Sequence, residues 1–155
     1  NCYLLIAVYE LPPMPTLFSK IIAGEIPCHR LYEDDHVLAF LDIGPVSHGH
    51  CLVIPKEPAA ELGDLSDDAA AALGRVLPRL VRAVKQATGC EGLNVLQNNG
   101  SAAGQEVMHV HFHLIPRYGK QAEATQKSFA TTWPAGKLSP ADAADLIQKI
   151  TAAVI

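Results

Sequence analysis

One long amphipathic helix in the middle of the chain constrains the fold more than any other stretch. Ser66 is a favourable N-cap, and Asp67 and Asp68 follow in the first turn, where the helix dipole stabilises negative charge. Gly89 is a typical C-terminal stop, and Pro78 predicts a kink in the interior. The apolar residues that recur at helical spacing are Leu73, Val76, Leu77, Leu80, Val81 and Val84. Because they form a single stripe, we expect this helix to pack against another layer.

Five short apolar runs, each bounded by turn residues, predict the strands of that layer. Three precede the long helix, within "CHRLYEDD", "HVLAFLDI" and "HGHCLVIPK". Two follow it, "GLNVLQ" and "VMHVHFHLIPR". Shorter helices are expected over 17–22 and after Ser139-Pro140. This order predicts an α+β fold, in which a five-stranded antiparallel meander has helices packed against it.

The chain of 155 residues has the length of one domain, which we expect over 14–155. Residues 1–13 are interpreted as an N-terminal extension, with an added edge strand or a packing arm as the alternative. The net charge of -4 argues against a protein that binds nucleic acid through a general phosphate field. No apolar run is long enough to span a bilayer, so no membrane partner is expected. Four cysteines without a C-x-x-C pair favour a reduced, cytoplasmic protein.

Three histidines alternate with apolar residues in "HVHFHLIPR". If the stretch is a strand, His109, His111 and His113 lie on one face about 6–7 Å apart. The intervening apolar side chains then face the helices. The preceding loop "NNGSAAGQ" adds amide groups and glycines next to the histidine face.

Four interpretations of this face remain open on the residues alone. It could have no function, or it could bind zinc together with His48 and His50. It could provide a histidine nucleophile for attack at phosphorus, because an imidazole with a pKa near 6.5 is largely neutral at pH 7. Such a ring must be aimed by a hydrogen bond from its other nitrogen. Finally, the same pocket could bind nucleotides without turnover.

The "HVHFHLI" pattern resembles that of the histidine-triad (HIT) family of nucleotide hydrolases and transferases. The stretches "LFSKIIAGEIP", "YEDDHVLAFLDIGPVSHGHCLVIPK" and "LNVLQNNGSAAGQEVMHVHFHLIPR" are similar to the branch that contains the nucleoside phosphoramidases. The resemblance covers roughly residues 16–118. It implies a five-stranded antiparallel sheet with one long and several shorter helices, and a homodimer with a continuous ten-stranded sheet.

The activity implied by this resemblance is hydrolysis of a purine nucleoside 5′-phosphoramidate or a related nucleoside-monophosphate-linked substrate, through a covalent nucleotidyl-histidine. The alternatives are a dinucleoside polyphosphate hydrolase and a nucleotide-binding protein with incidental turnover. His111 matches the nucleophile, His113 the histidine that contacts phosphate, and His109 the residue whose carbonyl orients the central ring. His50 matches a further histidine that supports the triad.

The resemblance also implies a set of substrate-binding residues. Asp42 matches a carboxylate that binds both ribose hydroxyls, while Asn98 and Gln105 match amides that contact phosphate. The positions that match the apolar pocket around the base are Phe18, Ile21, Ile26, Phe40 and Leu52. Each has a purely structural alternative: the apolar residues could be core, and Asp42 and Asn98 could serve turns.

Two departures from the family pattern limit what is carried over. Many bacterial relatives have a zinc site built from C-x-x-C and a later histidine, but the matching positions here are Thr16, Ser19 and Pro58. We therefore expect no metal and no cofactor. Animal phosphoramidases carry a serine where this chain has Glu106, so the treatment of the leaving group is left open. Glu106 could donate a proton or be a solvent-facing charge, and no role is assigned to Trp133.

Overall fold

The computed structural model describes residues 15–119 and 136–154. The expected extension over 1–13 and Trp133 lie outside the described residues. Within them, no helix is both long enough and apolar enough to cross a membrane.

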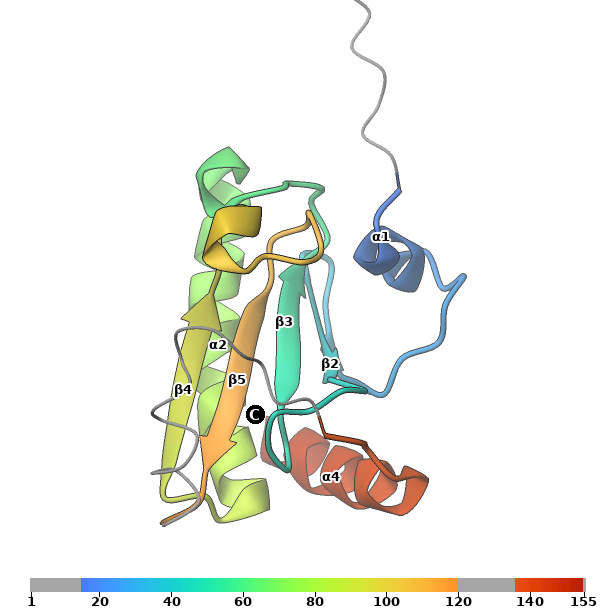
Figure 1. Ribbon diagram of the computed structural model, residues 1–155, viewed down its shortest axis with the longest axis vertical. Helices are drawn as coiled ribbons and strands as arrows, with labels where there is room; N and C mark the ends of the chain where they lie inside the picture. The colour runs from blue at the N-terminus through green and yellow to red at the C-terminus, as the bar shows by residue number, and fades with distance from the viewer. Residues whose placement is uncertain (1–14, 120–135, 155) are drawn as a thin grey trace, which may run out of the picture.

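A five-stranded antiparallel sheet forms the framework, as predicted, with the order β1-β2-β3-β5-β4 (Figure 1). The strands are β1 Arg30–Glu33, β2 Val37–Leu41, β3 Cys51–Pro55, β4 Gly92–Gln97 and β5 Phe112–Arg117. The expectation of a simple meander is wrong for the last two. After β3 the chain runs through α2 to the far edge, so that β4 becomes the edge strand and β5 returns between β3 and β4.

The long helix α2 spans Asp67–Thr88 and confirms the predicted caps. The Ser66 hydroxyl accepts a hydrogen bond from the backbone N–H of Ala69 at 3.2 Å, and Gly89 adopts a left-handed φ of 65°. The helix continues through Pro78. Its buried stripe packs with α4 (Pro140–Ala153) on one face of the sheet. Both helices therefore stabilise the fold from the side opposite to the histidines.

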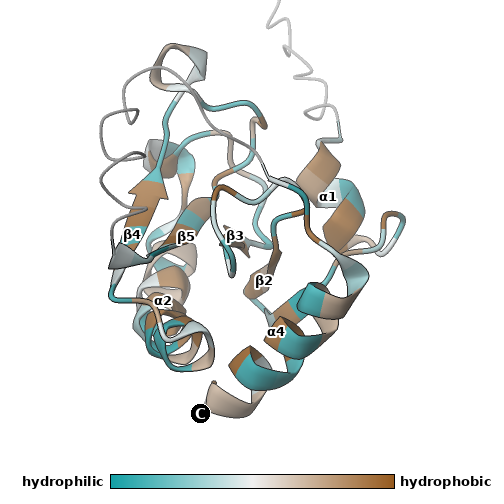
Figure 2. Ribbon diagram, turned by 60° about the horizontal axis from the view of Figure 1, so that its bottom comes forward, coloured by the Kyte–Doolittle hydropathy of each residue, from teal (hydrophilic) through white to brown (hydrophobic). Residues whose placement is uncertain are grey.

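The other face of the sheet is covered by the short helix α1, Leu17–Ile22, as predicted. Phe18 and Ile21 of α1 pack on alternate residues of β2 and β3, which are Leu38, Phe40, Leu52 and Ile54. Figure 2 shows the strands between α1 and α2. Two 3-10 turns, η1 Leu62–Asp64 and η2 Ser101–Ala103, lie in the loops before α2 and after β4.

The histidine stretch is only partly a strand, which corrects the prediction for 107–117. The strand β5 begins at Phe112, and the chain before it turns tightly, with the N–H of His109 donating to the carbonyl of Val107 at 2.8 Å. Strand alternation therefore places only His113. The rings of His111 and His113 meet edge to face, with their centroids 4.9 Å apart.

Candidate active site

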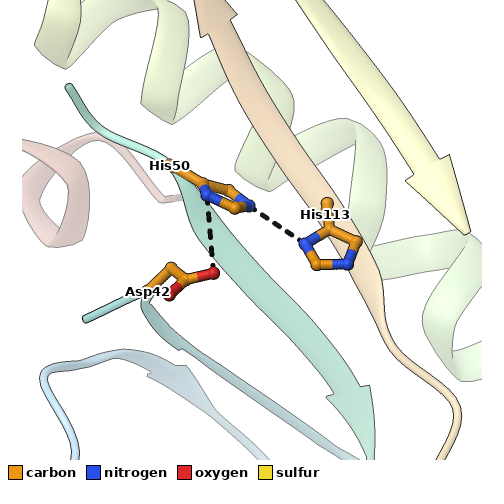
Figure 3. A group of neighbouring side chains, drawn as sticks. All are labelled: Asp42, His50 and His113. Carbon is orange, nitrogen blue, oxygen red and sulfur yellow. Dashed lines mark hydrogen bonds and ion pairs between the residues drawn. The ribbon is translucent and has the colours of Figure 1, made fainter. Parts of the chain in front are cut away.

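Three neighbouring strands bring Asp42, His50 and His113 together. Asp42 follows β2, His50 precedes β3 and His113 lies within β5, and their side chains converge in Figure 3. The register fixes this arrangement, since Leu52 pairs with His113 and the N–H of Asp42 donates to the carbonyl of His50 at 3.0 Å. The site therefore rests on the three inner strands of the sheet.

The protons on His50 and His113 can be assigned from their hydrogen bonds. The backbone N–H of Val46 donates to Nδ1 of His50 at 3.2 Å, so this nitrogen carries the lone pair and Nε2 carries the proton. His50 Nε2 lies 3.0 Å from Nδ1 of His113 and donates to it. The proton of His113 is then on its Nε2. His50 thus holds His113 in the tautomer whose Nε2–H, on the side of the ring away from His50, is a hydrogen-bond donor.

Burial keeps both of these rings neutral. It is the largest cause that lowers the pKa of His50 to about 3 and that of His113 to about 3. Asp42 Oδ2 lies 3.4 Å from Nδ1 of His50, but this contact is an ion pair only if His50 is protonated. Burial raises the pKa of Asp42, which a cationic His50 would oppose. We therefore interpret the contact as a neutral imidazole beside a partly buried carboxyl group.

His111 is held in the tautomer that a nucleophile requires. Its Nδ1–H donates to the backbone carbonyl of His109 at 2.7 Å, so the lone pair is on Nε2. The pKa of His111 is lowered, chiefly by burial, while the carboxylates of Asp42 and Glu106 act in the opposite direction. The ring is therefore neutral at pH 7, with one nitrogen fixed and the other available.

Two contacts hold the carbonyl that orients His111. The ring of His109 is only 2% exposed, and its Nε2 donates to the carbonyl of Pro55 at 2.8 Å. Phe18 packs edge-on against both His109 and His111, at centroid distances of 6.1 and 5.2 Å. The helix α1 thus fixes the triad as well as covering the sheet.

The loop before the triad is braced by Gln105, which is 2% exposed. Its side-chain oxygen accepts from the N–H of Gly100 at 2.7 Å, and its amide nitrogen donates to the carbonyls of Ala60 and Val107 at 2.6 and 3.0 Å. Asn98 donates to the carbonyl of Gly104 at 3.3 Å. These bonds give both amides a structural role in the loop, and the expectation that they contact phosphate stays a prediction.

The predicted apolar pocket residues lie together on the triad side of the sheet. Phe18, Ile21, Phe40 and Leu52 are buried in one cluster, and Ile26 packs at its margin. Two features of the site were not predicted from the sequence. Ile43, next to Asp42, is a large apolar side chain that is 77% exposed. The N–H of Val46 is a backbone group, for which the sequence has no signal.

The positions that match the family zinc site do not offer metal ligands here. Thr16 is the N-cap of α1: its hydroxyl accepts from the N–H of Ser19 at 3.1 Å, and the Ser19 hydroxyl donates to the Thr16 carbonyl at 2.8 Å. Pro58 is exposed and has no ligand atom in its side chain. These residues do not fit the structural zinc of the bacterial relatives.

Asp42, His50 and His113 do bring ligand atoms within 4.8 Å of one another. However, the facing nitrogens of His50 and His113 are 3.0 Å apart and their ring centroids 5.2 Å apart, so the rings meet almost head-on. An ion about 2.0 Å from both nitrogens would have to lie off the line that joins them, away from the direction of their lone pairs. The geometry between these two nitrogens favours a hydrogen bond over a bound metal ion.

The two neutral rings predict that the protein loses stability in mild acid. An unfolded chain protonates His50 and His113 near pH 6.5, whereas the folded chain does so near pH 3, so protons favour the unfolded state between these values. The free energy of unfolding should fall by up to about 1.4 kcal/mol per pH unit for each ring. Urea titrations at pH 7, 6 and 5 measure this slope. His50→Gln should reduce it and the exposed-site control His36→Gln should not, while a flat stability would contradict the assignment.

Known proteins are similar to this chain over most of its length. Residues 23–120 match the HIT domain. The chain is 45% identical to adenosine 5′-monophosphoramidase of Schizosaccharomyces pombe over 91% of its own length and 99% of that protein. A crystal structure of a Hit-like protein from Bartonella henselae superimposes with a TM-score of 0.75 at 35% identity, covering 89% of this chain and 95% of that one. A zinc-bound histidine triad protein from Mycobacterium smegmatis gives 0.73 at 31% identity, covering 91% and 94%.

Proposed function

This chain belongs to the HIT domain family, in its nucleoside-phosphoramidase-like branch, and we propose that it hydrolyses a purine nucleoside 5′-phosphoramidate or a related nucleoside-monophosphate-linked substrate. The observation that carries the proposal is the tautomer of His111. Its Nε2 lone pair is fixed by the bond from Nδ1–H to the carbonyl of His109, beside a ring that offers an N–H donor. The similarity to the S. pombe phosphoramidase supports the same reaction.

The chemistry follows from these two rings. In the first step, Nε2 of His111 attacks phosphorus and a phosphorus–nitrogen bond forms as the bond to the leaving amine breaks. The departing nitrogen keeps the electron pair and takes a proton from His113 Nε2–H, and the proton that the attacking water releases in the second step restores this N–H. In the second step, water attacks the nucleotidyl-histidine, and the products are a nucleoside monophosphate and regenerated His111. Each step displaces one group at phosphorus.

The remaining residues are proposed to bind the nucleoside. The carboxyl group of Asp42 can accept two hydrogen bonds and would hold the ribose hydroxyls. The apolar cluster that contains Phe18 and Phe40 would support the base, with the exposed Ile43 against its outer side. His50 is a positioning residue, because it acts through its hydrogen bond to His113.

The test is hydrolysis of adenosine 5′-monophosphoramidate by the purified protein, followed by rapid acid quenching. We expect release of ammonia and AMP, with a transient nucleotidyl group attached to one histidine-containing peptide. Saturable AMP binding without hydrolysis of any nucleotide amidate would support a binding protein instead. Hydrolysis of diadenosine polyphosphates alone would support the alternative hydrolase.

We also propose that the protein is a homodimer, in which a second copy extends the sheet at β4. This strand is at the sheet edge, and its Val95 is 50% exposed, as expected for a strand that pairs with another chain. Sedimentation velocity at micromolar concentration should give about twice the 16.6 kDa of one chain. A monomer under these conditions would exclude the proposal.

A reducing compartment such as the cytoplasm fits the described cysteines. Cys28, Cys51 and Cys90 are free thiols, and disulfides are rare in the cytoplasm. Fractionation of the source cells would test this location.

A further inference from the structure

Nδ1 of His50 lies between two groups that favour opposite positions of the ring proton. The backbone N–H of Val46 donates to this nitrogen at 3.2 Å, which requires a lone pair on it. Oδ2 of Asp42 lies 3.4 Å from the same nitrogen, and Figure 3 shows the carboxylate directed at it. Because a carboxylate accepts hydrogen bonds and donates none, Asp42 favours a proton where Val46 favours a lone pair.

The position of the proton on His50 decides whether His113 carries a donor on Nε2. His50 Nε2 lies 3.0 Å from Nδ1 of His113, so one of these nitrogens donates and the other accepts. In the arrangement that Val46 favours, both rings carry their proton on Nε2. In the arrangement that Asp42 favours, both carry it on Nδ1, and Nε2 of His113 has a lone pair instead of a proton.

Both rings stay neutral when one arrangement changes into the other. The proton on His50 Nε2 passes to Nδ1 of His113 along their hydrogen bond. His113 Nε2 gives its proton to water, and Nδ1 of His50 takes one from water. The two arrangements therefore differ in where the protons lie and not in charge, so that a neighbouring hydrogen bond can decide between them.

The contacts of Asp42 allow a ligand to influence this choice. Its Oδ1 accepts from the N–H of Gly44 at 2.8 Å, while its Oδ2 faces His50. The side chain of Asp42 is 18% exposed and that of His50 is 0% exposed, so a ligand can reach the carboxylate but not the ring. A hydroxyl that donates to Oδ2 satisfies this oxygen and weakens its attraction for a proton on Nδ1 of His50.

We propose that Asp42 couples recognition of the ribose to proton transfer, because ribose hydroxyls that donate to its carboxylate leave Val46 to set the tautomers of His50 and His113. Without these hydroxyls, the carboxylate holds a fraction of the molecules in the arrangement that lacks the Nε2 donor of His113. The proposal rests on the proposed function, in which Asp42 accepts from the ribose and His113 is the general acid. It adds that the hydroxyls raise kcat as well as lowering KM, with Asp42 as a positioning residue.

Nitrogen-15 NMR of the histidine rings tests the coupling without any reaction. The chemical shift of a ring nitrogen distinguishes a bound proton from a lone pair, and spectra of His50→Gln and His113→Asn assign the signals. Adenosine brings hydroxyls but no phosphate, and it should shift both rings towards the tautomer with the proton on Nε2. 2′,3′-Dideoxyadenosine at equal occupancy should not. Adenosine that fails to bind, or that binds without changing the tautomers, would overturn the inference.

The kinetic test compares adenosine 5′-monophosphoramidate with its 2′,3′-dideoxy analogue. We expect kcat to be about tenfold higher with the hydroxyls present, the scale of one hydrogen bond to a charged group. Nitrophenyl esters of the same two nucleotides should differ in KM but hardly in kcat, because nitrophenolate leaves without a proton. An equal effect on kcat for both leaving groups would show that the hydroxyls only orient the substrate, against the proposed coupling.

The variant Asp42→Asn separates the charge of this side chain from its shape. The amide oxygen can accept from the N–H of Gly44, which places the NH₂ group beside Nδ1 of His50 as a donor to its lone pair. The ligand-free variant should therefore already show the tautomers that wild-type protein shows with adenosine. Its KM for the amidate should rise, while the difference in kcat between the two amidates should disappear. A variant that kept this difference would contradict the role of the carboxylate.

The matched control is Asp35→Asn, the same change at an exposed position in the β1–β2 turn. It should keep the wild-type response to adenosine and the wild-type ratio of kcat values, and an equal loss in this control would reduce the effect of Asp42 to one of net charge. Thermal unfolding verifies that each variant is folded.

The outcomes distinguish this inference from the proposed function. If the wild-type protein cleaves the amidate but adenosine leaves the tautomers unchanged, the coupling is wrong and the phosphoramidase activity stands. If adenosine changes the tautomers but neither amidate is cleaved, the proposed function fails, while the link from Asp42 to His113 stands.

Discussion

Replacing His111 with asparagine should lower kcat for adenosine 5′-monophosphoramidate by about 10⁴-fold or more, the scale expected when a nucleophile is removed. The asparagine amide can still donate to the carbonyl of His109, which accepts from Nδ1–H of His111 at 2.7 Å in the native protein. The loss should therefore reflect the missing Nε2 lone pair and not a disturbed loop. Steady-state kinetics and a search for the nucleotidyl-protein after acid quenching measure both consequences.

Nucleotide binding should survive this substitution. Asp42 and the apolar cluster around Phe18 and Phe40 do not depend on the His111 lone pair, so the dissociation constant for AMP by calorimetry should stay within about threefold, a difference of about 0.7 kcal/mol. The control is His36→Asn, the same change at an exposed position in the β1–β2 turn. A variant at 111 that retained most of its turnover would refute the nucleophile assignment.

The second large effect is expected at His113, and it should depend on the leaving group. His113→Asn keeps an oxygen that can accept from Nε2–H of His50, whose bond to His113 is 3.0 Å long, but it removes the donor on the far side of the ring. An amine cannot leave phosphorus without a proton. We therefore expect kcat for the phosphoramidate to fall by about 10²-fold or more, the usual contribution of a general acid.

A substrate that needs no proton isolates this role. A nucleoside phosphodiester with a nitrophenol leaving group has this property, because nitrophenolate departs as a stable anion. The rate of its hydrolysis by His113→Asn should fall by less than about tenfold, because this substrate does not need the general acid that the variant lacks. Equal losses on both substrates would show that His113 supports the structure or binds phosphate without transferring a proton. His50→Gln should show the same dependence on the leaving group in weaker form, since His50 acts through His113.

The local signals in the sequence were reliable where short-range chemistry decides the structure. Ser66 caps the start of α2 and Gly89 caps its end, as predicted, because an N-cap hydroxyl and a left-handed glycine act within one helical turn. The predicted start of β5 was wrong, because contacts with distant parts of the chain decide where this strand begins. The alternation of histidines suggested a strand from 107 onward, but Val110 donates to the carbonyl of Ala59 and His109 is tied to Pro55, and these contacts bend the chain before Phe112.

The order of β4 and β5 was missed for a similar reason. Nothing in "GLNVLQ" or "HFHLIPR" encodes which neighbour each strand takes. That choice depends on where the chain emerges from α2 after crossing the sheet, and packing over the whole domain decides this position.

The sequence by itself predicted one site made of three histidines, one aspartate and an amide-containing loop, and it determined where α1 and α2 begin and end. Only the tertiary structure decided how the protons are distributed. The carbonyl of His109, the N–H of Val46 and the carbonyl of Pro55 each fix a ring nitrogen, and all three are backbone groups. Every residue type except proline offers the same backbone donor and acceptor, so their effect arises from position alone.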